Sequence, residues 1–158
     1  MALVMNLKGA VGTANDSDIN IKVDKGVIFI DISDKMLFKS GSFDVTKGAK
    51  AVLAKVADVL KNQPDVEFMV EGNTDNVPLR GHPGLVDNWD LSVKRATSVV
   101  RILAKTYGIP PAKMTAAGRG EWAPLMPNDS KEGRAVNRRT RIVILPQLDQ
   151  FFNLLERK

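Results

Sequence analysis

The stretch that decides the fold is Glu71-Gly-Asn-Thr-Asp-Asn-Val-Pro78, followed by Asn88-Trp-Asp-Leu-Ser-Val-Lys-Arg-Ala96. An apolar run leads into it, polar turn-forming residues follow, and a helical pattern begins at its second half. The sequence therefore predicts a strand, a loop and a helix in direct succession. Asp75 comes just after the strand, and Arg95 lies about two turns into the helix. Loops carried on such a scaffold are where binding groups usually lie.

The rest of the chain predicts an α+β framework that supports this crossing. Five segments show the alternating or continuous apolar pattern of strands: residues 19–23, 27–32, 66–70, 113–117 and 139–145. The first two form a hairpin, and the last, apolar on consecutive positions, is expected to be central. Helical spacing predicts helices over residues 46–62 and 88–108. This order predicts a mixed β-sheet with helices packed on one face.

Length and composition indicate one globular domain. The chain has 158 residues, of which 44% are hydrophobic and 26% charged, and this balance suits a folded protein. We expect the domain at residues 18–146, a tail or short helix at 1–17 and an amphipathic helix at 147–158. No apolar run reaches the roughly 20 residues of a membrane-spanning helix. The first residues also lack the pattern of a signal peptide.

The residue types present argue against several classes of function. The chain has no cysteine, which excludes disulfides, thiolate metal sites and cysteine nucleophiles. It has no Gly-x-Ser-x-Gly and no phosphate loop, so we expect neither an enzyme nor a cofactor. His82 lies near Asp87 and Asp90 but lacks a second nitrogen or sulfur ligand, so we expect no metal.

The net charge of +5 suits an anionic partner. Few aromatic residues lie among the basic ones, whereas proteins that bind single-stranded nucleic acid stack bases on such residues. We therefore expect no nucleic-acid partner, and a basic nucleic-acid-binding domain stays only as a less favoured alternative function.

Five blocks of the sequence resemble one known family. In order they are Leu37-Phe-Lys-Ser-Gly-Ser42, Val70-Glu-Gly-Asn-Thr-Asp75, Asn88-Trp-Asp-Leu-Ser-Val-Lys-Arg-Ala96, Gly118-Arg-Gly-Glu121 with Pro124, and Glu132-Gly-Arg-Ala-Val-Asn-Arg-Arg139. Through them, residues Gly26 to Pro146 resemble the OmpA-like domain, the peptidoglycan-binding module of Gram-negative outer-membrane proteins, lipoproteins and flagellar stator subunits. Trp89 and the long loop are most similar to the stator-type branch. The resemblance implies a periplasmic location and attachment through an N-terminal membrane or lipid anchor outside this sequence.

The resemblance also implies a ligand, the diaminopimelate residue of the peptidoglycan stem peptide, with Asp75 and Arg95 as the principal contacts. The side-chain end of that residue is a zwitterion. Asp75 would accept its ammonium, and the planar guanidinium of Arg95 would bind its carboxylate through two parallel hydrogen bonds. Asn88 would add side-chain hydrogen bonds, and backbone amides near Thr74 and Asn76 would add donors.

Several of these residues also allow a structural interpretation. Asp75 can cap a turn or neutralise Arg138 or Arg139, and Arg95 can form an ion pair on the helix surface. Arg138 and Arg139 can orient Asp75, contact glycan or face the solvent. Trp89 is expected to be a wedge beneath the loop rather than a sugar platform.

Two departures from the family pattern bear on the site. Asn73 stands where the family usually has His or Tyr, which removes any contact that a ring makes there. The insertion at residues 78–87 separates Asp75 from Arg95 in sequence, so their closeness in space is a prediction. An alternative function is self-association, as a homodimer, through the amphipathic ends Leu3–Leu7 and Phe151–Leu155.

Overall fold

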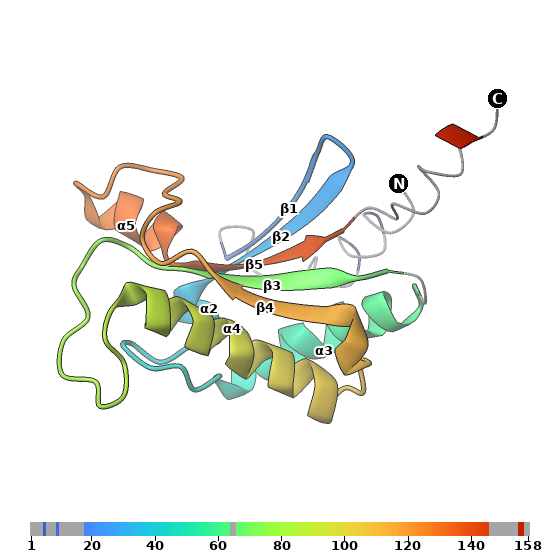
Figure 1. Cartoon of the computed structure of the whole chain (residues 1–158), viewed down its shortest axis with the longest axis horizontal. Helices are drawn as coiled ribbons and strands as arrows, with labels where there is room; N and C mark the ends of the chain where they lie inside the picture. Colours follow the sequence, from blue (N-terminus) through green and yellow to red (C-terminus); the bar gives the residue numbers. More distant parts are fainter. Residues whose placement is uncertain (1–4, 6–8, 10–17, 64–65, 146–154, 157–158) are drawn as a thin grey trace.

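A five-stranded sheet forms the centre of the protein (Figure 1). The computed structural model describes residues 5, 9, 18–63, 66–145 and 155–156. The strands are β1 (Ile19–Asp24), β2 (Val27–Ser33), β3 (Phe68–Asn73), β4 (Met114–Gly118) and β5 (Arg139–Ile144). Their order across the sheet is β1-β2-β5-β3-β4, and only β3 and β4 pair in parallel. The predicted hairpin and the central position of the last strand are both confirmed.

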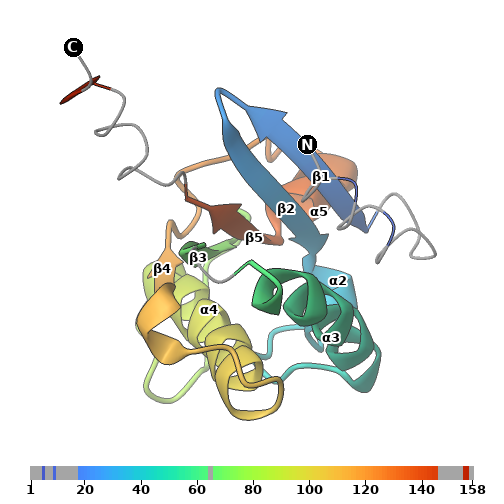
Figure 2. The same ribbon diagram turned by 90° about the vertical axis from the view of Figure 1, so that its right-hand side faces the viewer.

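Two long helices cover one face of this sheet (Figure 2). The helical segments are α2 (Asp34–Leu37), α3 (Lys47–Lys61), α4 (Asn88–Lys105), the 3₁₀ turn η1 (Pro111–Lys113) and α5 (Lys131–Asn137). Both α3 and α4 lie on the same side of the strands, which confirms the predicted α+β sheet with helices on one face.

Side chains cap the first turn of both long helices and so define where the helices begin. The hydroxyl of Thr46 accepts a hydrogen bond from the amide of Ala49 at the start of α3, and the carboxylate of Asp87 does the same for Asp90 in α4. Such caps satisfy amides that have no partner inside the helix. Asp87 also puts a negative charge at the positive end of the α4 dipole.

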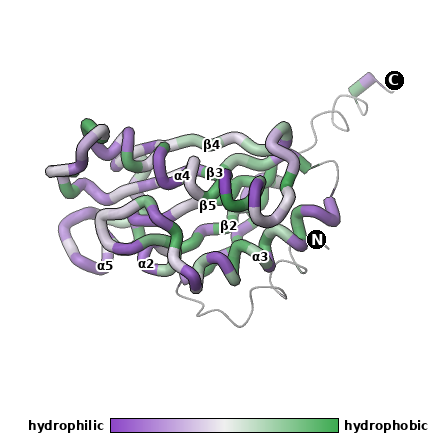
Figure 3. The backbone as a smooth tube through the Cα atoms, turned by 90° about the horizontal axis from the view of Figure 1, so that it is seen from below, coloured by the Kyte–Doolittle hydropathy of each residue, from purple (hydrophilic) through white to green (hydrophobic). Residues whose placement is uncertain are grey.

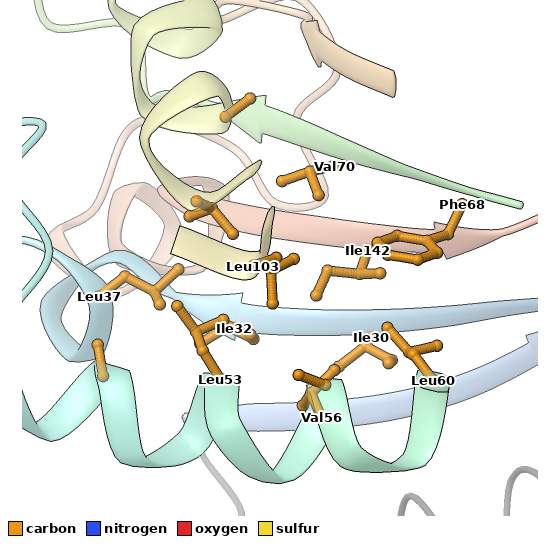
Figure 4. Packing of buried hydrophobic residues seen from close by; sticks show 14 of the residues in the cluster. Ile30, Ile32, Leu37, Leu53, Val56, Leu60, Phe68, Val70, Leu103 and Ile142 are labelled. Atoms are coloured by element: carbon orange, nitrogen blue, oxygen red, sulfur yellow. The ribbon is translucent and has the colours of Figure 1, made fainter. Parts of the chain in front are cut away.

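The core lies between the sheet and the two helices. Figure 4 shows the side chains of Ile30, Ile32 and Ile142 from the sheet meeting Leu53 and Val56 from α3. Alternate strand residues and every third or fourth helix residue point inward, as the two periodicities require. In Figure 3, hydrophilic residues predominate at the end of the molecule that carries α2 and α5, whereas the strands toward the other end are more hydrophobic.

Two short helices, α2 and α5, were not predicted. Each is seven residues or fewer, too short for the apolar periodicity on which a helix prediction depends. The predicted terminal segments, 1–17 and 147–158, fall almost entirely outside the described residues. Within the described part of the chain, no helix combines the length and the apolar character needed to cross a membrane.

The backbone of α4 touches the sheet at Gly72, one residue before the end of β3, and at Gly118, the last residue of β4. A Cβ atom on Gly72 would collide with the carbonyl oxygen of Ser92, and one on Gly118 would lie 2.7 Å from the amide nitrogen of Val93. Only glycine leaves room for this approach. The contact sets the height of the first half of α4 above the sheet.

We predict that Gly72→Ala or Gly118→Ala destabilises the protein by about 1–3 kcal/mol, the usual cost of forcing extra atoms into a packed contact. Gly48→Ala is the matched control, because Gly48 lies in α3 with nothing near the position of the added methyl group. We expect Gly48→Ala to leave stability unchanged or raise it. Urea unfolding of the three variants measures this, and equal stabilities would refute the close-contact interpretation.

Candidate functional site

Segments that are far apart in the sequence meet at one end of the molecule. Figure 1 shows the end of β3, the start of α4, and helices α2 and α5 gathered there. The amide of Asp34 at the start of α2 donates to the carbonyl of Arg138, which follows α5, at 3.0 Å. The predicted binding residues come from these same segments.

Asp75 follows β3 and both its carboxylate oxygens have partners. Its Oδ1 accepts a hydrogen bond from the amide of Val77 at 3.0 Å, and its Oδ2 accepts one from Nη1 of Arg138 at 2.7 Å. Asp75 is only 7% exposed. Both structural roles considered for it, turn capping and neutralisation of an arginine, are therefore present.

Arg95 is buried and projects from α4 toward α2. Its Nη1 lies 2.6 Å from Oδ1 of Asp34, and its Nε donates to the carbonyl oxygen of Ser42 at 2.9 Å. The guanidinium carbon lies 5.0 Å from the centre of the Phe38 ring, within reach of a cation–π interaction. Because Arg95 is only 4% exposed, it is not a helix-surface ion-pair residue.

Asn88 and Thr74 hold the loop that carries Asp75. The side-chain amide of Asn88 donates to the carbonyls of Asp75 and Val77 at 3.3 and 3.0 Å. Thr74 donates from its backbone amide to Gly120 and from its hydroxyl to the carbonyl of Asp75. The Thr74 amide predicted as a ligand donor is therefore already in use. Asn76 is exposed and does not line the groove described next.

A groove of about 1220 Å³ opens over these residues. Asp75, Arg95, Asn88 and Arg138 all line it. The inserted loop contributes Pro78, Leu79, Arg80 and His82 to its wall. The predicted acid and guanidinium thus share one opening despite the insertion, with space beside them for a guest.

Burial shifts the pKa of both partners in the Asp34–Arg95 pair. It raises the pKa of the Asp34 carboxyl above the ordinary 3.8, although nearby Arg95 and Arg138 act in the opposite direction. It also lowers the pKa of Arg95, against the attraction of Asp34. For both partners the loss of hydration outweighs their mutual attraction, as is common for buried ion pairs. Such perturbed groups in a groove are typical of functional sites.

The two neighbouring arginines, whose roles the sequence left open, differ in their surroundings. Arg138 reaches Asp75 and its side chain is 38% exposed. Arg139 is buried, donates to the carbonyls of Asn137 and Ala123 at 3.2 Å, and has no partner for its Nε within the described residues. Burial lowers the pKa of Arg139. Both arginines line the groove, where Arg138 orients Asp75 and the buried Arg139 also supports the loop before α5.

Of the other residues considered from the sequence, Trp89 and Asn73 do not line the groove, whereas His82 does. Trp89 is 49% exposed, lies against Gly120 and does not line the groove, so it is only partly a wedge. Asn73 is buried and does not line the groove either. His82 lines it, and the described residues hold no cluster of three or more His, Cys, Asp or Glu side chains.

Asp34 is the residue that sequence analysis missed. Its signal was the pair Ser33-Asp34 directly after a predicted strand, an N-cap followed by an acidic residue, which is typical of a helix start. Its pairing with Arg95 spans 61 positions of sequence and is visible only in the folded chain.

We predict that Asp34 makes stability depend on pH. The folded state holds the Asp34 proton to a higher pH than the unfolded chain does, so its stabilising contribution is full below about 3.8 and is lost as pH rises through the folded pKa. The difference in unfolding free energy between wild type and Asp34→Asn should therefore fall with rising pH above 3.8. Urea unfolding at a series of pH values measures it, and a difference that stays constant or grows would contradict the prediction.

Comparison with protein families matches residues 37–138 to the OmpA family. Among curated proteins, motility protein B of Bacillus subtilis is 29% identical over 132 residues, covering 84% of this chain and 50% of that protein. The chain spans about half the length of the first curated relatives that it matches.

Solved structures share the fold and part of the sequence. A MotB-like protein from Desulfovibrio vulgaris has a TM-score of 0.83 and 32% identity, covering 90% of this chain and 88% of that one. The cell wall anchor of the T6SS from Pseudomonas aeruginosa has a TM-score of 0.77 and 29% identity, covering 90% of this chain and 96% of that one. The relatives come from Bacillus as well as Pseudomonas, so the similarity is not specific to outer-membrane proteins.

Proposed function

Because this chain belongs to the OmpA family, we propose that it binds peptidoglycan and holds its parent protein to the bacterial cell wall. It is a non-catalytic binding domain. The similarity to a cell wall anchor supports this function. The location that fits it is the periplasmic side of the membrane, with attachment of the parent protein through a segment outside this sequence.

The observation that carries the proposal is one groove lined by Asp75 and Arg95. The ligand that suits this pair is the free side-chain end of diaminopimelate in the stem peptide, which carries an ammonium and a carboxylate on one carbon. Asp75 would receive the ammonium and Arg95 the carboxylate. The loop held by Asn88 would form the wall against which the peptide lies.

A single site of this kind binds weakly. Hydrogen bonds to charged groups contribute about 1.5–3 kcal/mol each, so two such contacts correspond to a dissociation constant near the millimolar range. Many domains facing one polymeric wall would bind together far more firmly, because effective concentration replaces single-site strength. The proposed anchor therefore depends on the number of attachments.

Retention on purified sacculi tests the proposal. We expect the wild type to be retained, and Asp75→Ala, Arg95→Ala and Arg95→Lys to lose about tenfold or more of their affinity, the effect of removing one contact to a charged group. Arg95→Lys keeps the charge but removes the planar fork that matches a carboxylate.

Asp58→Ala and Arg101→Ala are the matched controls, because they remove the same charges from exposed positions of α3 and α4. We expect both controls to be retained like the wild type. Circular dichroism verifies that each variant is folded. Equal retention of folded wild type, Asp75→Ala and Arg95→Ala would remove the binding-site assignment.

A further inference from the structure

Among the charged side chains that line the groove, four come from different parts of the chain and lie in contact as pairs. Asp34 comes from α2, Asp75 follows β3, Arg95 comes from α4 and Arg138 follows α5. They form two ion pairs, Asp34 with Arg95 at 2.6 Å and Asp75 with Arg138 at 2.7 Å. We call these four residues the charge quartet. Two carboxylates and two guanidinium groups give it a net charge of zero.

The quartet is one electrostatic unit. The pKa of Asp34 responds to Arg95, Arg138 and Asp75, and that of Arg95 responds to the other three. Three of the four side chains are at most 12% exposed. In such surroundings a charge without a counter-charge is costly. The fold therefore holds each predicted ligand contact beside an internal group of opposite sign.

The pairing leaves capacity for a guest. Asp34 contacts Arg95 through Oδ1, and Arg95 uses Nη1 and Nε for Asp34 and Ser42. Among the described residues, no hydrogen bond is formed by Oδ2 of Asp34 or Nη2 of Arg95. A guest carboxylate can thus bind Arg95 while Asp34 still contacts the other nitrogen. The same guest's ammonium then has two carboxylates, those of Asp75 and Asp34, on the walls of the same groove.

Charge balance decides which guest the quartet accepts. A zwitterion adds one charge of each sign and leaves the buried region neutral. A guest that carries only an ammonium or only a carboxylate leaves one charge without compensation where hydration is poor. The pair Asp75 and Arg95 has no net charge by itself. With Arg138 but without Asp34, the same site would have a net positive charge, and with Asp34 but without Arg138 it would have a net negative charge.

We propose that Asp34 and Arg138 are specificity-determining residues, which keep the charge quartet neutral and so select a zwitterionic amino-acid end over a singly charged one. This inference rests on the proposed function, in which Asp75 and Arg95 are the direct contacts. Loss of the Asp34 charge leaves the quartet with an excess positive charge and shifts the preference of the site toward carboxylate-only guests. Loss of the Arg138 charge shifts it toward ammonium-only guests.

Three stem peptides that differ at a single side-chain end test the inference. The first carries diaminopimelate with its free ammonium and carboxylate, the second carries lysine and so only the ammonium, and the third carries diaminopimelate acetylated on that nitrogen and so only the carboxylate. Dissociation constants from calorimetry or NMR titration rank them for each protein. We expect the wild type to favour the first peptide over the other two by about tenfold, the effect of one contact to a charged group.

The variants are Asp34→Asn and Arg138→Gln, with Asp58→Asn on the exposed face of α3 as the control. In Asp34→Asn we expect the advantage of the first peptide over the acetylated peptide to fall about tenfold, whereas Asp58→Asn keeps the wild-type ranking. In Arg138→Gln the advantage over the lysine peptide should fall instead. Arg138 is the most exposed member of the quartet, so its substitution disturbs the core least. This variant therefore tests the inference even if Asp34→Asn does not fold.

The outcomes separate this inference from the proposed function. A wild type that binds the first peptide, with both quartet variants keeping its ranking, would overturn the inference and leave the proposed function intact. A wild type that binds neither sacculi nor any of the peptides would overturn both. Opposite shifts in the peptide preference of the two variants, with an unchanged preference in the control, would support the inference.

Discussion

The close contact between α4 and the sheet is the constraint on which the rest of the structure depends. Gly72 and Gly118 let the backbone at Ser92 and Val93 lie directly on β3 and β4. The hydroxyl of Ser92 accepts a hydrogen bond from the amide of Gly120 at 3.0 Å. The first half of α4 is thereby attached to both the sheet and the loop after β4. These attachments fix the direction in which the helix presents its polar edge, which carries Asn88 and Arg95.

That polar edge connects α4 to distant segments and carries Arg95, one of the two proposed ligand contacts. Asn88 and Arg95 lie on it, and each contacts a segment from elsewhere in the chain: Asn88 the loop after β3, and Arg95 the residues around α2. Buried ion pairs of this kind add little net stability, because the loss of hydration offsets the attraction. Under the proposed function, they hold charged groups in a defined arrangement before a ligand arrives, which reduces the cost of ordering them on binding.

Most of the framework was predictable because its signals are local. The caps at Thr46 and Asp87 and the apolar spacing of α3 and α4 lie within a few residues of one another, and the strands follow the same logic. Asp75 and Arg95 were also found from the sequence, through motifs that resemble a family. Arg138 was one of two arginines considered as the partner of Asp75, whereas Asp34 was missed because it lies in a helix too short to show a period.

The sequence by itself determined the order of the strands and the two long helices, the family, and the charged residue types available at the candidate site. Only the tertiary structure decided that Asp75 is held by Arg138 and Arg95 by Asp34, that Arg139 is buried support, and that the inserted loop walls a groove. The physical reason is that propensity and periodicity act between near neighbours, whereas charge pairing and burial depend on which distant segments the packed core brings together.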